Sequence, residues 1–155
     1  ADLEFTALRV LPPFAILAAS HPLAGQASVS LAELAPHPMI LLDLPLSADY
    51  FASLFDQAGI KPRIVERTQD MAVVQAMVGH DLGYAIANLR PQSETSPDGR
   101  PLRFVPLAGA VKPMRLGLLS AAGGKSALTV QAFVDHCRTV LSEDLMARLT
   151  VKARA

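Results

Sequence analysis

The sequence predicts an α/β fold built around parallel strands, and two observations carry this prediction. Between residues 39 and 87, short apolar runs alternate with segments whose apolar residues recur at helical spacing. This alternation of strands and helices is typical of a parallel sheet with right-handed crossovers. In addition, 51% of the 155 residues are hydrophobic and 18% are charged, so the chain can fill one packed domain or two small lobes.

The N-terminal part begins with two short apolar runs. Residues 5–10 and 14–19 predict two strands, because Pro12 and Pro13 between them interrupt regular structure. A Ser-x-x-Glu pattern then predicts a brief helical turn over residues 31–35, since this spacing is that of a capping box.

The middle of the chain opens with a strand, a helix and a second strand. Residues 39–42 are wholly apolar, as in a strand that is covered on both faces. Ser47 is placed to cap a helix over residues 47–58, and Gly59 is placed to end it. Residues 63–67 are the next predicted strand.

A second helix and a third strand complete the alternating pattern. Thr68 or Asp70 can cap the helix predicted over residues 71–78. Residues 83–87 read as another buried strand, and residues 91–101 form a loop rich in proline, serine and glycine. The middle of the chain thus carries three strands that can lie side by side.

The C-terminal part is predicted to hold two strands and the longest helix. The strands are residues 103–107 and 114–120, and the helix spans residues 126–141. Cys137 lies on the apolar stripe of this helix and is predicted to be buried. From Arg148 onward the chain is basic, and we expect a frayed tail.

The composition excludes several classes of function. Lys and Arg number 14, as do Asp and Glu, so the chain lacks the basic excess of a nucleic-acid-binding module. Cys137 is the only cysteine, which rules out an internal disulfide and fits a reducing compartment. No apolar run reaches the roughly 18 residues that a membrane span requires, and the N-terminus lacks the layout of a signal peptide. We therefore expect a cytoplasmic protein with no membrane partner.

No group of residues predicts a metal, a cofactor or a catalytic centre. The four histidines show no metal-ligand spacing, and His21 and His37 precede prolines in turns that we expect at the surface. No serine lies in the Gly-x-Ser-x-Gly pattern of a hydrolase. We expect that the chain is not an enzyme.

Polar side chains follow each of the three middle strands, and these define a candidate ligand site. Ser47, Thr68 and Asn88 come after consecutive strand ends, and parallel strands bring those ends to one edge of the sheet. Two helix N-termini and Arg90 join them there, which suits a small ligand that bears a carboxylate. The alternative is structural, because helix capping alone can explain Ser47 and Thr68, and Asn88 can satisfy a turn.

Several stretches, in their order and spacing, resemble the effector-binding domain of LysR-type transcriptional regulators. They are Phe14–Ala24 with its His-Pro-Leu-Ala turn, Ser30–Leu34, Pro38–Leu42, Leu41–Pro45 with Tyr50-Phe51, and Met77–Ala87. The resemblance covers most of residues 3 to 142.

The resemblance implies a fold like that of type II periplasmic binding proteins, with two α/β lobes joined by two crossing segments. The implied division is residues 1–38 for part of the first lobe and a crossing segment, 39–103 for the second lobe, 104–142 for the return to the first lobe with a C-terminal helix, and 143–155 for a tail. The first lobe is incomplete here, because the family's winged helix-turn-helix, linker helix and opening strands of that lobe are absent from these residues. We expect the uncovered apolar surface to promote self-association.

The resemblance also implies a function and a site. An effector in the cleft would shift the equilibrium between arrangements of a homodimer or homotetramer, and DNA would be bound only through the winged helix-turn-helix. The implied effector-binding residues are Leu44, Ser47, Thr68, Asn88 and Leu89, with Ser20 and His21 facing them from the first lobe.

Two other classes of protein are open at this point. A solute-binding protein of a transport system would have the same fold, and the residues upstream in the natural chain would distinguish it. An enzyme of this fold would need a concentrated set of titratable side chains at the cleft, and the sequence offers Asp43, Asp70 and Arg90 there.

Overall fold

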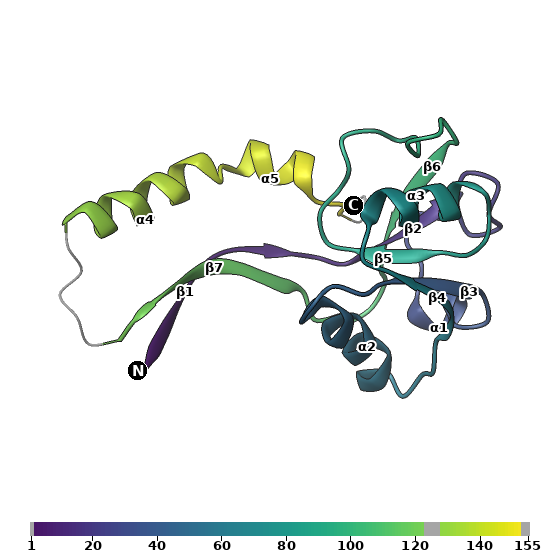
Figure 1. Ribbon diagram of the computed structural model, residues 1–155, viewed down its shortest axis with the longest axis horizontal. Coiled ribbons are helices and arrows are strands. Elements are labelled where there is room, and N and C mark those ends of the chain that lie inside the picture. The colour runs from purple at the N-terminus through teal and green to yellow at the C-terminus, as the bar shows by residue number, and fades with distance from the viewer. Residues whose placement is uncertain (1, 123–127, 153–155) are drawn as a thin grey trace.

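The computed structural model describes residues 2–122 and 128–152 (Figure 1). The elements in chain order are β1 (Leu3–Leu11), β2 (Phe14–Ala18), α1 (Leu31–Leu34), β3 (Pro38–Leu42), α2 (Ser47–Gln57), β4 (Arg63–Thr68), α3 (Met71–Gly79), β5 (Ala85–Ala87), β6 (Leu102–Pro106), β7 (Met114–Ala121), α4 (Leu128–Val140) and α5 (Glu143–Leu149). The predicted α/β class is confirmed. Residues 14–107 form what we call the body, and β1 with β7 forms the arm.

Five strands of the body lie side by side in the order β4, β3, β5, β2, β6. β3 and β4 are parallel, and an isolated parallel bridge between Met39 and Tyr84 joins β3 to the start of β5. A Cβ atom on Gly83 would lie 2.7 Å from the Pro38 carbonyl oxygen, so glycine at this position lets the two strands approach. The three middle strands therefore point the same way, as predicted.

β2 lies inside this sheet and runs antiparallel to both of its neighbours. It pairs antiparallel with β5 on one side and with β6 on the other, and its five residues are all buried. The sequence-based division placed residues 1–38 with a different lobe from residues 39–103. In the structure β2 shares one core with the strands of the predicted second lobe, because its wholly apolar run needs cover on both faces.

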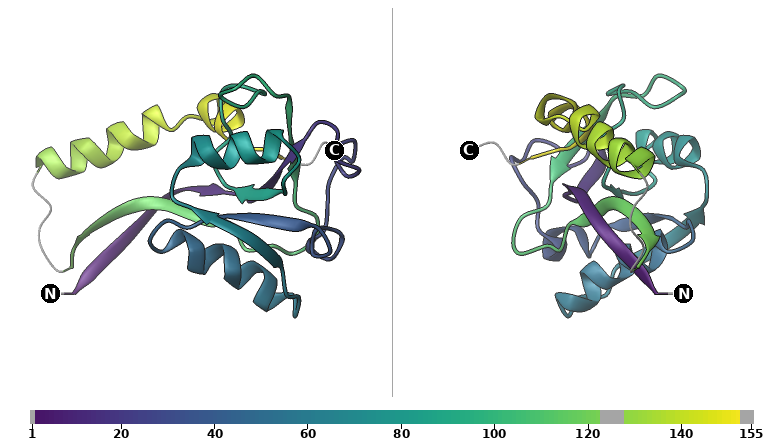
Figure 2. Two further views of the ribbon diagram at one scale, coloured as in Figure 1. Left: turned by 45° about the vertical axis from the view of Figure 1, so that its right-hand side comes forward. Right: turned by 90° about the vertical axis from the view of Figure 1, so that its left-hand side faces the viewer.

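Helices cover both faces of the sheet. α3 packs on one face and α2 on the opposite face, with α1 beside α2 (Figures 1 and 2). Phe55 of α2 and Val78 of α3 are fully buried in the core that these layers enclose. Two predicted caps are confirmed. Ser30 and Glu33 form the capping box of α1, and the Asp70 carboxylate accepts a hydrogen bond from the backbone N–H of Ala72 at 2.8 Å.

The arm and α4 extend away from the body (Figure 1). β1 and β7 pair antiparallel along their length, and the Arg9 Nε donates a hydrogen bond to the Leu141 carbonyl at 2.7 Å, which ties the arm to the end of α4. No described residue of α4 is buried, and Phe133 is 56% exposed. The prediction that Cys137 is buried is wrong, because its side chain is only partly covered in the described structure. The predicted helix start at residue 126 lies outside the described residues.

The chain after residue 142 returns to the body as a helix. Residues 143–155 are predicted to be a tail, but residues 143–149 form α5, which Ser142 caps through a hydrogen bond from the Leu145 N–H. Met146 is buried, and the Arg90 N–H donates to the Leu149 carbonyl at 2.8 Å. The burial of Met146 and the Ser142 cap stabilise this helix, which the basic composition of the C-terminal residues does not predict. Residues 153–155 lie outside the described part of the chain.

Candidate functional site

The carboxyl ends of β3, β4 and β5 meet at one edge of the sheet. Leu42 lies opposite Thr68, and the Asp43 N–H donates to the Thr68 carbonyl at 2.8 Å. β5 runs parallel to β3, so its last residue ends at the same edge. The residues at and just after these strand ends therefore lie at the same edge of the sheet. We call five of them the rim: Leu44, Ser47, Thr68, Asn88 and Leu89.

α2 begins at the rim without a side-chain cap. The sequence predicts that Ser47 caps this helix, but the N-cap residue is Leu46 and no side chain bonds to the first turn. Ser47 is instead the first helical residue, and its hydroxyl makes no hydrogen bond within the described residues. Leu46 has a φ of 68°, a left-handed conformation that is strained for a leucine. The Ser47 and Ala48 N–H groups both donate to the Leu44 carbonyl at 3.1 Å. Within the described residues, this leaves the Asp49 N–H and the Ser47 hydroxyl as the donors that the first turn presents to a ligand at this edge.

Two of the carboxylates near the rim have structural partners. Asp70 caps α3, and its own N–H donates to the Thr68 hydroxyl at 3.3 Å. The Asp43 carboxylate lies 3.9 Å from the Arg67 guanidinium in an exposed ion pair. Asp49, in the first turn of α2, is a third carboxylate at this edge, so the site suits an anion of low charge.

Asn88 is the most enclosed polar side chain of the rim. It is 5% exposed, and its Nδ2 donates to the Leu11 carbonyl at 2.9 Å and to the Tyr50 hydroxyl at 3.1 Å. Because a carbonyl can only accept, the amide nitrogen must face Leu11, which fixes the position of Oδ1. That buried oxygen has no hydrogen-bond partner in the described residues. An unpaired buried acceptor is costly, so a hydrogen donor that reached it through a shift of the surrounding residues would stabilise the site.

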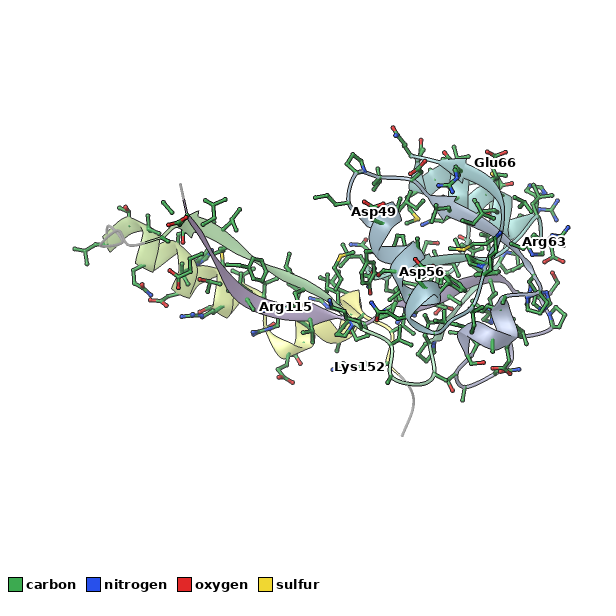
Figure 3. All side chains as sticks on the ribbon, turned by 90° about the horizontal axis from the view of Figure 1, so that it is seen from below. Asp49, Asp56, Arg63, Glu66, Arg115 and Lys152 are labelled. Atoms are coloured by element: carbon green, nitrogen blue, oxygen red, sulfur yellow. The ribbon has the colours of Figure 1, made fainter. Side chains whose placement is uncertain are left out.

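Tyr50 connects this amide to the arm. Its hydroxyl donates to the Lys112 carbonyl at 2.9 Å, while Asn88 holds the carbonyl of Leu11 at the end of β1. Burial raises the pKa of the Tyr50 phenol, so the hydroxyl stays protonated and available to donate. Figure 3 shows Asp49, the neighbour of Tyr50, on the side of the body that faces the arm. The local sequence around Tyr50 shows only the helical spacing of apolar residues, so it does not reveal a partner 38 residues away.

Ser20 and His21 do not lie at the rim. β2 runs antiparallel to β5, with Phe14 opposite Ala87, so the residues that follow β2 emerge at the other edge of the sheet. There the His21 ring packs edge-on against His37, with 4.6 Å between ring centroids. His21 is 8% exposed, so the expectation of a surface position is also wrong.

Burial lowers the pKa of His21, and the neighbouring His37 lowers it further, while Asp81 opposes both effects. In the unfolded chain the His21 imidazole takes up a proton near its ordinary pKa of about 6.5. The folded chain takes it up only at lower pH. The stability of the fold is therefore fully retained above about pH 6.5, and it falls as the pH is lowered from there toward the pKa of His21 in the folded chain.

We expect His21→Asn to reduce this loss of stability at low pH, because asparagine does not take up a proton. The asparagine oxygen can still accept the hydrogen bond that the Leu23 N–H donates to Nδ1 of His21. Urea unfolding at pH 7 and pH 5 measures the change. The control is His136→Asn on the exposed α4, which should leave the pH dependence as it is. Equal pH slopes for the His21 variant and the unmodified chain would contradict the assignment.

Two hollows are described on the surface, and neither is lined by the rim. One of about 250 Å³ lies between α1, the end of α2 and residues 108–112. The other, of about 750 Å³, lies between residues 24–27, β6 and residues 147–152. Within residues 2–122 and 128–152, no group of three His, Cys, Asp or Glu side chains can hold a metal ion, and no helix could cross a membrane.

The sequence matches the family described as LysR substrate binding domain over residues 1–142. No curated protein sequence matches it. Among solved structures, HinK, a LysR family transcriptional regulator from Pseudomonas aeruginosa, is 35% identical, with a TM-score of 0.83. That match covers 92% of this chain and 50% of HinK, so the chain spans about half the length of that regulator.

Two further structures extend the likeness. The C-terminal domain of a probable LysR family transcriptional regulator from Rhodococcus sp. RHA1 is 30% identical, with a TM-score of 0.78 over 88% of this chain and 67% of its own. The effector binding domain of QuiR in complex with shikimate shares the fold at 21% identity and a TM-score of 0.69, over 90% of this chain and 65% of its own.

Proposed function

The chain belongs to the family of LysR substrate binding domains, and on this basis we propose that it is the ligand-sensing part of a transcriptional regulator. The predicted fold, like that of type II periplasmic binding proteins, is the fold of this family. The regulator would act in the cytoplasm as a homodimer or homotetramer. DNA binding belongs, in this proposal, to a winged helix-turn-helix outside these 155 residues, which carry equal numbers of acidic and basic side chains.

The ligand we propose is a small carboxylate that also carries a hydroxyl or amino hydrogen. The observation that carries this proposal is Asn88, whose buried Oδ1 lacks a donor among the described residues and lies beside the uncapped first turn of α2. The Asp49 N–H of that turn and the Ser47 hydroxyl can donate to a carboxylate, and the amide oxygen can accept from a hydroxyl or amino group. Shikimate, which the QuiR structure contains, is a hydroxycarboxylate and so has both groups.

The rim is also placed to pass a signal to the arm. Asn88 and Tyr50 hold the backbone on both sides of the junction, at Leu11 and at Lys112. We propose that the arm is the crossing segment, that the body is one lobe, and that α4 with the far end of the arm belongs to the other. A ligand that binds Asn88 differently in two arm positions would shift the equilibrium between them.

We also propose that the domain does not catalyse a reaction. The carboxylates of Asp43 and Asp70 are engaged in an ion pair and a helix cap, so neither is positioned as a free acid or base. A catalytic site would need titratable groups directed at a common point. The rim offers instead hydroxyl, amide and backbone donors and acceptors.

Alanine substitution at the rim tests this function in the full-length protein. We expect Ser47→Ala to weaken the binding of a recognised carboxylate about tenfold, because one hydrogen bond to a charged group is lost. Thr68→Ala should act less, and Asn88→Ala should act most. Isothermal titration calorimetry against a panel of small hydroxycarboxylates and amino acids measures each affinity.

The matched control is Ser20→Ala, which removes the same hydroxyl at the opposite edge of the sheet and should leave every affinity unchanged. Thermal unfolding of each variant separates a binding defect from loss of the fold. The rim assignment is wrong if Ser47→Ala and Thr68→Ala both bind all recognised carboxylates as the unmodified protein does.

A further inference from the structure

The larger hollow is a second candidate site, distinct from the rim. It lies where the C-terminal residues 147–152 meet the open edge of the sheet at β6, and the turn 24–27 closes its end. Its volume of about 750 Å³ falls within the range of small-molecule pockets. Figure 3 labels Lys152 at this junction between the body and the arm.

The hollow is electropositive although the chain as a whole is neutral. Arg90, Arg103 and Lys152 line it together with one carboxylate, that of Glu94. Glu94 forms an ion pair with Arg90, with 2.7 Å between Arg90 Nη2 and Glu94 Oε1. Arg103 and Lys152 have no ion-pair partner within residues 2–122 and 128–152, and Arg103 donates only from Nη1, to the Leu102 carbonyl. Its remaining guanidinium N–H groups suit a bidentate carboxylate.

Apolar residues also line the hollow, beside its charged and polar ones. Val105 is buried, and the Phe104 ring is packed edge-on against Phe14 with 5.7 Å between centroids. The Arg90 guanidinium lies 5.8 Å from the centre of the Phe104 ring, so a cation and an aromatic surface adjoin. Val151 supplies the facing wall. The site therefore combines hydrocarbon contacts with positive charge.

We propose that this hollow binds a small organic anion, a carboxylate on an aromatic or aliphatic body. The carboxylate would bond to Arg103, and the apolar body would lie against Phe104 and Val105. Because Val151 and Thr150 form the opposite wall, the ligand would join the body to the segment that α5 delivers. Its binding would stabilise the contact in which the Arg90 N–H donates to Leu149. This proposal does not depend on the rim.

Phenylacetate and its neutral counterpart phenylacetamide test the site in the full-length protein. Methyl NMR follows the signals of Val105, Ala147 and Val151 during titration. We expect saturable shifts with phenylacetate, and about tenfold weaker binding of the amide, because the charge-assisted hydrogen bonds to Arg103 are lost. Arg103→Gln should weaken phenylacetate to the same extent.

The control is Arg63→Gln, the same change at an exposed arginine on the far side of the body, which should leave the titration unchanged (Figure 3). Ser47→Ala should also have no effect, so that a failure here and a failure at the rim are distinguishable. The proposal is overturned if these methyl signals do not saturate, if acid and amide bind alike, or if Arg103→Gln behaves like Arg63→Gln.

Discussion

Phe55→Ala is expected to lower the free energy of unfolding by about 3–5 kcal/mol, the range found for a phenylalanine removed from a packed core. Phe55 is fully buried where α2 packs against the sheet, so the substitution leaves a cavity that the sheet cannot close. Equilibrium urea denaturation of the chain measures the change. Since α2 carries Ser47 and Tyr50, ligand binding at the rim should weaken as well.

Phe133→Ala is the control, because it is the same substitution on α4 at a side chain that is 56% exposed. It should change the free energy of unfolding by about 1 kcal/mol or less. A loss at Phe133 as large as that at Phe55 would contradict the position of the core inside the body.

Asn88→Asp is expected to destabilise the chain at neutral pH by about 3 kcal/mol or more, since it places an unpaired charge in a buried position. The amide donor to the Leu11 carbonyl and to Tyr50 is replaced by an oxygen that the Leu11 carbonyl repels. Burial would raise the pKa of the introduced carboxyl group above its unfolded value of about 3.9. The folded state then binds the proton more tightly, so the deficit should shrink as the pH falls from 7 toward 5.

Gln92→Glu adds the same charge in an exposed loop and should leave stability within about 0.5 kcal/mol at either pH. Thermal unfolding at the two pH values compares the variants. A pH-independent deficit for Asn88→Asp would show that the amide at the junction of arm and body is not enclosed as described.

The local elements and the fold class can be inferred from the sequence. The capping box at Ser30 and Glu33, the apolar run of β3 and the helical spacing in α3 each involve residues within one or two turns of one another. Local hydrogen bonds and the period of burial depend on residues that are close in the sequence, so they can be inferred without knowledge of the tertiary structure. The parallel direction of β3, β4 and β5 followed from their alternation with helices, and this brought the rim to one edge.

Which distant residues share that edge depends on the packing of the whole sheet. β2 lies between β5 and β6 in the antiparallel direction, and this removes Ser20 and His21 from the rim. The partnership of Asn88 with Tyr50 is equally invisible in sequence. A wholly apolar strand is buried equally well in either direction, so its pattern carries no information on direction or neighbours. Only the packing of the complete sheet fixes both.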